Sequence, residues 1–234
     1  MITLNLNGKS LLAFFFLLLL LAELHELAHI FTGYAFCGCW GERDFNVWGL
    51  CEGCRDENPW AIAATFAGPL FTFGLIWLGR YWLKGQDARK QILGFILIFA
   101  NLPFARIITA LMGGGDEVYG LSIVWGDDAN WYFIWGLGVV IVLALSLPPL
   151  LTAWKAIANT HRWAYFMGFL ILPMLLVVLV IFVGLNGLLA QGVLATPLIW
   201  GTPLLISVHT LIVALLVRQT FPYLFQLGKK EENL

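Results

Sequence analysis

Six long apolar runs constrain the fold of this chain more than any other feature. A transmembrane helix needs about 20 consecutive apolar residues, and the runs of that length are Leu11–Phe36, Trp60–Leu83, Gln91–Met112, Trp131–Ala153, Trp163–Leu189 and Pro197–Thr220. No small-x-small cleavage site follows the first run, so we expect it to be retained. We predict an all-α, polytopic membrane helical bundle of about six transmembrane helices, in a single integral membrane domain over residues 1–234.

Basic residues are distributed unevenly between the two sides of such a bundle. With six spans, the side of both termini receives Lys9, Arg80, Lys84, Arg89, Lys90, Lys155, Arg162, Arg218, Lys229 and Lys230. The other side receives Arg43 and Arg55 together with Glu42, Asp44, Glu52, Asp56, Glu57, Asp116, Glu117, Asp127 and Asp128. The positive-inside rule then predicts that both termini are cytoplasmic, and we expect a multi-pass protein of a bacterial inner membrane. No basic cluster points to nucleic acid.

The first apolar run contains the pattern HExxH, His25-Glu26-Leu27-Ala28-His29. Residues four apart share one face of a helix, so both imidazoles can bind one metal ion, for which zinc is the expected cofactor. Glu26 would then be the catalytic general base toward a water that the zinc activates. The alternative is that the histidines only make hydrogen bonds within the bundle. That alternative must account for these ionisable groups, and for Glu23 nearby, at positions where each costs about 2–3 kcal/mol or more.

A catalytic zinc site usually has three protein ligands, so the two histidines need a partner. The third apolar run ends at Gly113-Gly114-Gly115 on the same side of the membrane as the exit of the first. Asp116 is therefore the preferred third ligand and Glu117 the alternative; either could also be an ordinary loop acid. Arg106, within the third run, would form an ion pair with Asp116, Glu117 or Glu23, or stabilise an oxyanion. We expect His209, in the last run, to make only a polar contact.

The first half of the chain resembles the site-2 protease family of intramembrane zinc metalloproteases, including its bacterial branch. Three features carry the resemblance: His25-Glu26-Leu27-Ala28-His29, Ala67-Gly68-Pro69-Leu70 and Asn101-Leu102-Pro103. It implies a metalloprotease-like core over residues 1–117, with further transmembrane helices over 118–234. It also implies a zinc ion on both histidines and an aspartate, and Glu26 as the base. The implied activity is that of a zinc metalloendopeptidase, which cleaves membrane or juxtamembrane segments of peptide or membrane-protein substrates.

The chain departs from the family pattern at two places. The family usually carries an Asp-Gly shortly after its Asn and Pro, where this chain has Ile107-Ile108-Thr109-Ala110. Asp116 would serve instead if the three glycines unwind the helix and return it toward the metal. The substrate-clamping Asn of the family is replaced by Thr72. These departures leave two other readings: a non-catalytic metal-binding membrane protein, or an accessory subunit that docks on a partner in a larger membrane complex.

All four cysteines lie between the first two apolar runs, at Cys37, Cys39, Cys51 and Cys54. Four thiolates at this spacing could form a second metal site. Two disulfides could instead close the loop if it faces an oxidising compartment, which the predicted topology favours. The loop also contains aromatic residues, so we expect a small ordered cap over the metal-bearing end of the bundle.

Overall fold

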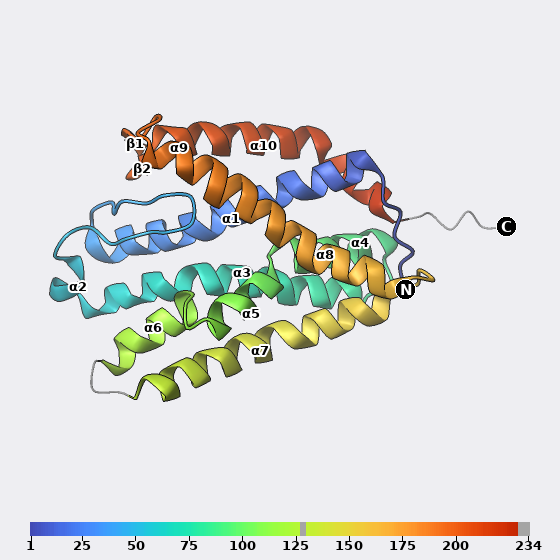
Figure 1. Ribbon diagram of the computed structural model, residues 1–234, viewed down its shortest axis with the longest axis horizontal. Coiled ribbons are helices and arrows are strands. Elements are labelled where there is room, and N and C mark those ends of the chain that lie inside the picture. Colours follow the sequence, from blue (N-terminus) through green and yellow to red (C-terminus); the bar gives the residue numbers. More distant parts are fainter. Residues whose placement is uncertain (127–129, 229–234) are drawn as a thin grey trace.

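A computed structural model gives the fold of this protein and describes residues 1–126 and 130–228. Within these residues, six helical segments are long and apolar enough to cross a membrane. They are α1 (Gly8–Cys37), a 3₁₀ turn (Pro59–Ile62) with α3 (Ala63–Leu83), α4 (Ala88–Ala100) with α5 (Pro103–Leu111), α7 (Trp131–Ala156), α8 (Arg162–Val177) with a π-helical stretch (Val178–Leu185) and α9 (Asn186–Ala190), and α10 (Leu204–Leu224) with a 3₁₀ turn (Phe225–Leu227). The predicted all-α membrane bundle is confirmed (Figure 1).

The start predicted for the last span is wrong. Pro197–Ile199 (β1) and Thr202–Pro203 (β2) form a small antiparallel hairpin instead of the first turns of a helix. Trp200 and Gly201 form its turn with positive φ angles of 54° and 68°. Two prolines within seven residues remove backbone donors that a helix would need, and Pro203 sits directly before the first turn of α10, where the missing N–H costs nothing.

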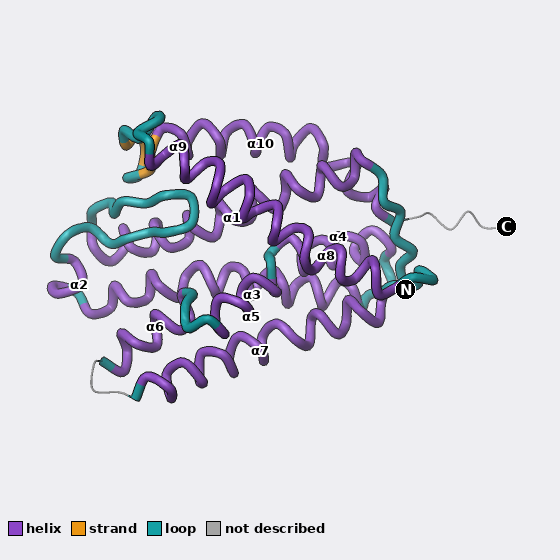
Figure 2. The backbone as a smooth tube through the Cα atoms, in the orientation of Figure 1, coloured by secondary structure: helices purple, strands orange, loops and turns teal. Residues whose placement is uncertain are grey.

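The N-terminus and Gly228, the last residue described, lie at one end of the bundle, as an even number of spans requires (Figure 1). Ile2 is bridged to Ile157, and Leu4 to Gly228, so the N-terminal segment is tied to the connection between α7 and α8 and to the residue after the last 3₁₀ turn. The loop that contains the cysteines lies at the opposite end (Figure 2). Four residues that entered the predicted charge asymmetry lie outside the described residues: Asp127, Asp128, Lys229 and Lys230.

An aromatic cluster joins three of the spans. Phe14 of α1, Phe95 and Phe99 of α4, and Phe169 of α8 have ring centroids 4.7–5.8 Å apart, mostly edge to face or tilted. Aromatic pairs prefer such geometries to a face-to-face sandwich. All four rings are buried, so this cluster holds α8 and α4 against the helix that contains both histidines.

The third span is interrupted between α4 and α5. Leu102 has a φ of 51°, and Pro103 follows it with no backbone N–H, so the helix cannot continue through this point. The Asn101 amide donates to the carbonyl of Leu97 at 2.7 Å, which satisfies one of the acceptors that the break leaves free. Beyond α5, a short helix α6 (Asp116–Trp125) leads toward α7.

The connection between α1 and the short helix α2 (Cys54–Glu57) folds back along the bundle; we call residues 38–53 the cysteine loop (Figure 2). Its ends are joined by two disulfides, Cys37–Cys54 and Cys39–Cys51. The sequence left two interpretations of the four cysteines open, a metal site and two disulfides. The structure shows the two disulfides.

The middle of the cysteine loop is inserted among the helices. The buried Arg43 donates from Nη2 to Glu23 Oε2 on α1 at 2.8 Å. Phe45 is buried with its ring edge against His209 of α10, and its backbone N–H donates to Asn186 Oδ1 at 3.3 Å. The polar contact expected of His209 is not found among the described residues: its ring packs on that of Phe45, and its buried Nδ1 has no hydrogen-bond partner there.

Each disulfide should stabilise the fold separately. The two bridges join residues 12 and 17 positions apart, and loops of this size predict about 3 kcal/mol for each. The double variants Cys37→Ser/Cys54→Ser and Cys39→Ser/Cys51→Ser should each melt at a lower temperature in detergent. Serine at both Cys51 and Cys54 breaks both bridges and should lower the melting temperature further. Unchanged melting in all three variants would contradict a stabilising role.

Candidate metal centre

Two histidines of α1 point toward the same place in the bundle. His25 and His29 lie four residues apart, and their side chains are 9% and 0% exposed. Their Nε2 atoms are 3.1 Å apart. This is a hydrogen-bond distance, so at most one of the two nitrogens carries a proton, and both are close enough to reach one cation.

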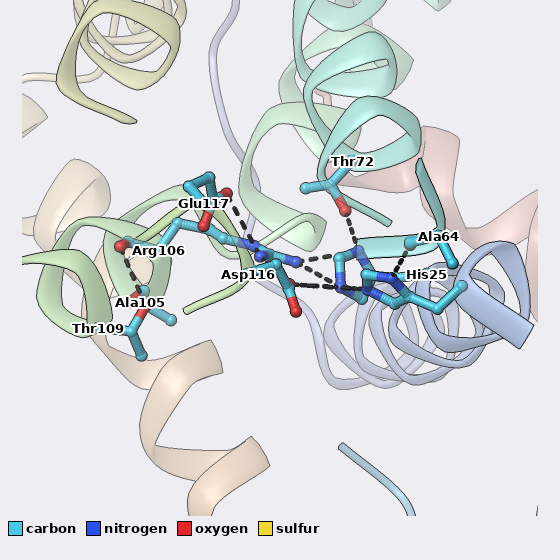
Figure 3. A network of polar contacts seen from close by, with 9 residues as sticks. His25, Ala64, Thr72, Ala105, Arg106, Thr109, Asp116 and Glu117 are labelled. Atoms are coloured by element: carbon cyan, nitrogen blue, oxygen red, sulfur yellow. Dashed lines mark hydrogen bonds and ion pairs between the residues drawn. The ribbon is translucent and has the colours of Figure 1, made fainter. Parts of the chain in front are cut away.

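Asp116 joins the histidines because the chain turns sharply after α5. Gly113 and Gly115 have φ angles of 81° and 84°, a conformation that glycine adopts without steric cost. The turn starts the new helix α6 at Asp116, and the carboxylate Oδ2 comes within 3.3 Å of His25 Nε2 and 3.6 Å of His29 Nε2 (Figure 3). The structure therefore brings Asp116, rather than Glu117, to the two imidazoles.

The other nitrogen of each imidazole is held by α3. His29 Nδ1 lies 2.6 Å from the carbonyl oxygen of Ala64, which can only accept, so this nitrogen carries the proton. His25 Nδ1 lies 2.8 Å from the hydroxyl of Thr72 (Figure 3). Both partners fix the ring orientation, and the carbonyl leaves His29 Nε2 with a free lone pair. Thr72 positions His25.

Gly68 allows α3 to approach the histidines this closely. A Cβ atom at this position would overlap with the ring of His29 and with that of His25. Pro69 follows directly and cannot continue the backbone hydrogen bonds of α3. The Ala67-Gly68-Pro69 segment is therefore the part of α3 on which the histidines pack.

The three candidate ligand atoms fit a tetrahedral zinc ion. With bond lengths of about 2.0–2.1 Å, two ligands of such an ion are about 3.3–3.4 Å apart. The separations between His25 Nε2, His29 Nε2 and Asp116 Oδ2 are 3.1, 3.3 and 3.6 Å. Two imidazoles and one carboxylate are also a donor set typical of catalytic zinc, with a fourth position left for water or substrate.

Arg106 of α5 lies against the same ligand atoms. Its Nη1 is 2.8 Å from Asp116 Oδ2 and 3.4 Å from Glu117 Oε1, and its Nη2 is 2.7 Å from His25 Nε2 (Figure 3). Two of the three partners considered for Arg106 are therefore present. Glu23 is not one of them, because it pairs with Arg43.

The two acids at the start of α6 differ in their surroundings. Burial alone would raise the pKa of Asp116, but contacts with His25 and His29 and the charge of Arg106 hold it well below the ordinary carboxyl value. Asp116 is thus an anion, as a metal ligand must be. Burial raises the pKa of Glu117, only partly offset by Arg106, and its Oε2 has no hydrogen-bond partner among the described residues.

Glu26 is buried beside the histidines. Its carboxylate oxygen Oε2 has no hydrogen-bond partner within the described part of the chain. A carboxylate left unpartnered in an apolar interior is costly unless something binds it, and its role as a proton acceptor stays a prediction.

Sequence reasoning missed one residue that covers the site. The indole of Trp48, in the cysteine loop, is stacked on the His29 ring with centroids 4.6 Å apart and planes 10° from parallel. The only signal was the aromatic content of the loop, which predicted a cap without indicating which side chain would reach the site. The disulfide-closed loop therefore shields one face of a candidate ligand.

Comparisons with models of protein families, with curated proteins and with solved structures find no match to this chain. The chemistry of the site therefore rests on its own residues and their geometry.

Gly68→Ala should disrupt the metal centre without unfolding the bundle. The added methyl group meets both imidazole rings, and disturbed positioning of ligands typically costs about 10–100-fold in metal affinity. The measurement is zinc per protein after dialysis against graded free zinc, with circular dichroism to follow helicity. Gly74→Ala is the matched control, since its methyl group, on the same helix, meets open space. Equal zinc affinity in both variants would exclude the packing role of Gly68.

Arg106→Gln should increase the affinity for divalent cations. The guanidinium contacts atoms of two candidate ligands, and a charged hydrogen bond of about 1.5–3 kcal/mol corresponds to about 10–100-fold in affinity. Titration with Co²⁺, followed by its visible absorption, measures this directly. A weaker affinity in Arg106→Gln would show instead that Arg106 holds Asp116 in place.

Proposed function

We propose that this protein is a membrane-embedded zinc metalloprotease. The observation that carries the proposal is the convergence of His25 Nε2, His29 Nε2 and Asp116 Oδ2 to within 3.1–3.6 Å of one another inside a bundle of apolar helices. Ionisable groups are costly in such a setting and are typically functional. The site-2 protease-like motifs in the same half of the chain favour the same chemistry.

Each residue of the site has a defined part in this proposal. His25, His29 and Asp116 hold the zinc ion, which when bound would act as a Lewis acid on a water and on the substrate carbonyl. Glu26 accepts the proton of the attacking water and returns it to the leaving amine. The Ala64 carbonyl keeps His29 in the tautomer that leaves Nε2 free, and Thr72 holds the ring orientation of His25.

The surroundings of the site favour a substrate in or near the membrane. A helix hides its peptide carbonyls, so a membrane-spanning segment must unwind locally before it can be cleaved. We place both termini in the cytoplasm of a bacterial cell, on the basic residues that flank their end of the bundle. The disulfides of the cysteine loop support this orientation, because they persist in an oxidising compartment.

A non-catalytic metal-binding protein is the second candidate. It is favoured by the side chains that cover two of the candidate ligands and limit access to them: Arg106 contacts His25, and Trp48 is stacked on His29. A metal with every position filled would stabilise the bundle without reaching a substrate. The two candidates agree on zinc content and differ on cleavage.

Glu26→Gln should keep the zinc but lose cleavage. The amide is nearly the same size as the carboxylate and is not one of the three candidate ligands, whereas removal of a general base typically costs about 10²–10⁴-fold. The test combines zinc content by mass spectrometry with cleavage of single-span reporter proteins in proteoliposomes. His25→Ala/His29→Ala should lose both zinc and cleavage. A wild type that binds zinc at these histidines and cleaves no reporter would favour the second candidate.

A further inference from the structure

The guanidinium of Arg106 lies against the atoms that a metal ion in the candidate centre would use. Its Nη2 is 2.7 Å from His25 Nε2, and its Nη1 is 2.8 Å from Asp116 Oδ2 (Figure 3). One side chain thus covers two of the three candidate ligand atoms. A metal ion binds through the lone pairs of those atoms and repels a second cation nearby, so Arg106 must leave this position when a metal binds.

A second carboxylate lies within reach of the same guanidinium. Arg106 Nη1 is 3.4 Å from Glu117 Oε1, so this nitrogen lies between two acids and is closer to Asp116. The side chain of Glu117 is only 5% exposed, and its Oε2 has no hydrogen-bond partner within residues 1–126 and 130–228. A short displacement of the guanidinium would therefore replace one carboxylate with another and give the unpartnered oxygen a donor.

The turn between α5 and α6 holds Glu117 against the helix that carries the arginine. A Cβ atom at Gly115 would lie 3.2 Å from Glu117 Oε2 and 3.3 Å from the hydroxyl oxygen of Thr109. Thr109 is one turn beyond Arg106 on α5, and its hydroxyl donates to the carbonyl of Arg106 at 3.1 Å. The unpartnered oxygen of Glu117 therefore lies on the α5 side of the turn.

We propose that Arg106 exchanges partners: it covers Asp116 and His25 in the metal-free protein and pairs with Glu117 in the metal-loaded protein. Glu117 is then a positioning residue for the arginine and not a metal ligand. The exchange keeps the arginine paired in both states, as an apolar interior requires, because an unpaired charge is costly there. This inference rests on the metal centre of the proposed function and not on cleavage.

A double-mutant cycle on metal affinity tests the exchange. Wild type, Glu117→Gln, Arg106→Gln and the double variant are titrated with Co²⁺ in nanodiscs, followed by visible absorption. Glu117→Gln removes the second partner and leaves the arginine on the ligand atoms, so it should lower the affinity by about tenfold or more in the presence of Arg106. In the Arg106→Gln background there is no guanidinium to receive, and the same change should alter the affinity by less than about threefold.

Two further variants separate position from charge. Glu57→Gln removes an exposed acid from α2, at the same end of the bundle, and should leave the affinity unchanged (Figure 1). Glu117→Asp keeps the charge but shortens the side chain, so it should also lower the affinity, by less than Glu117→Gln. It provides the test if Glu117→Gln fails to fold, which circular dichroism reports.

Four results would overturn the exchange. An equal loss with and without Arg106 would make Glu117 a ligand or a distant charge. No loss in either background would leave a static ion pair. Full affinity in Glu117→Asp would mean that only charge matters, and a coupling of Arg106 to Glu26 in the same cycle would assign the second partner to Glu26.

The outcomes also separate this inference from the proposed function. A wild type that binds no Co²⁺ at the histidines would remove the metal centre and both proposals with it. The expected coupling in a protein that cleaves no reporter would keep the exchange and remove the protease. Cleavage without the coupling would do the reverse.

Discussion

The close contact between α1 and α3 is the interaction on which the site depends. Gly68 lets the two helices meet at the level of the histidines, and Ala64 and Thr72, about one turn away on either side, hold the outer nitrogen of each ring. A bulkier residue at Gly68 would separate the two helices and displace the rings of both histidines from their present positions. The ligand geometry is thus a property of helix packing and not of the His-x-x-x-His spacing alone.

Among the described residues, the two arginines inside the bundle are paired with carboxylates, whereas the buried Glu26 has no ion pair. Arg43 pairs with Glu23, and Arg106 is shared between Asp116 and Glu117. In an apolar interior an unpaired charge is far costlier than a paired one. Arg106 also touches His25, so the cation that compensates the acids competes with any metal for the same lone pairs. The balance between these two cations sets how readily the site is filled.

The spans and the two histidines were predictable because both depend on local pattern: apolar length defines a span, and a spacing of four defines a helix face. The approach of Asp116 to the histidines was predictable in outline, because three consecutive glycines indicated a break in the helix. Its geometry was not, because it depends on positive φ angles at Gly113 and Gly115 and on the new helix that follows. Trp48 and Arg43 were beyond prediction, since a loop carries no periodicity to show where its side chains point. The hairpin at Pro197 was missed because hydropathy counts an apolar residue equally in a helix and a strand.

The insertion of the cysteine loop has a consequence for how the protein is made. Trp48 and Arg43 come from this loop, which also contacts Asn186 of α9 and His209 of α10, in the last two spans of the chain. During synthesis the histidines enter the membrane long before those residues exist. The loop therefore cannot make all of its contacts until the last two spans are in place. Until then, the histidines would not be fully covered by the loop. Maturation of the site is coupled to completion of the polypeptide, although all three candidate ligands are in its first half.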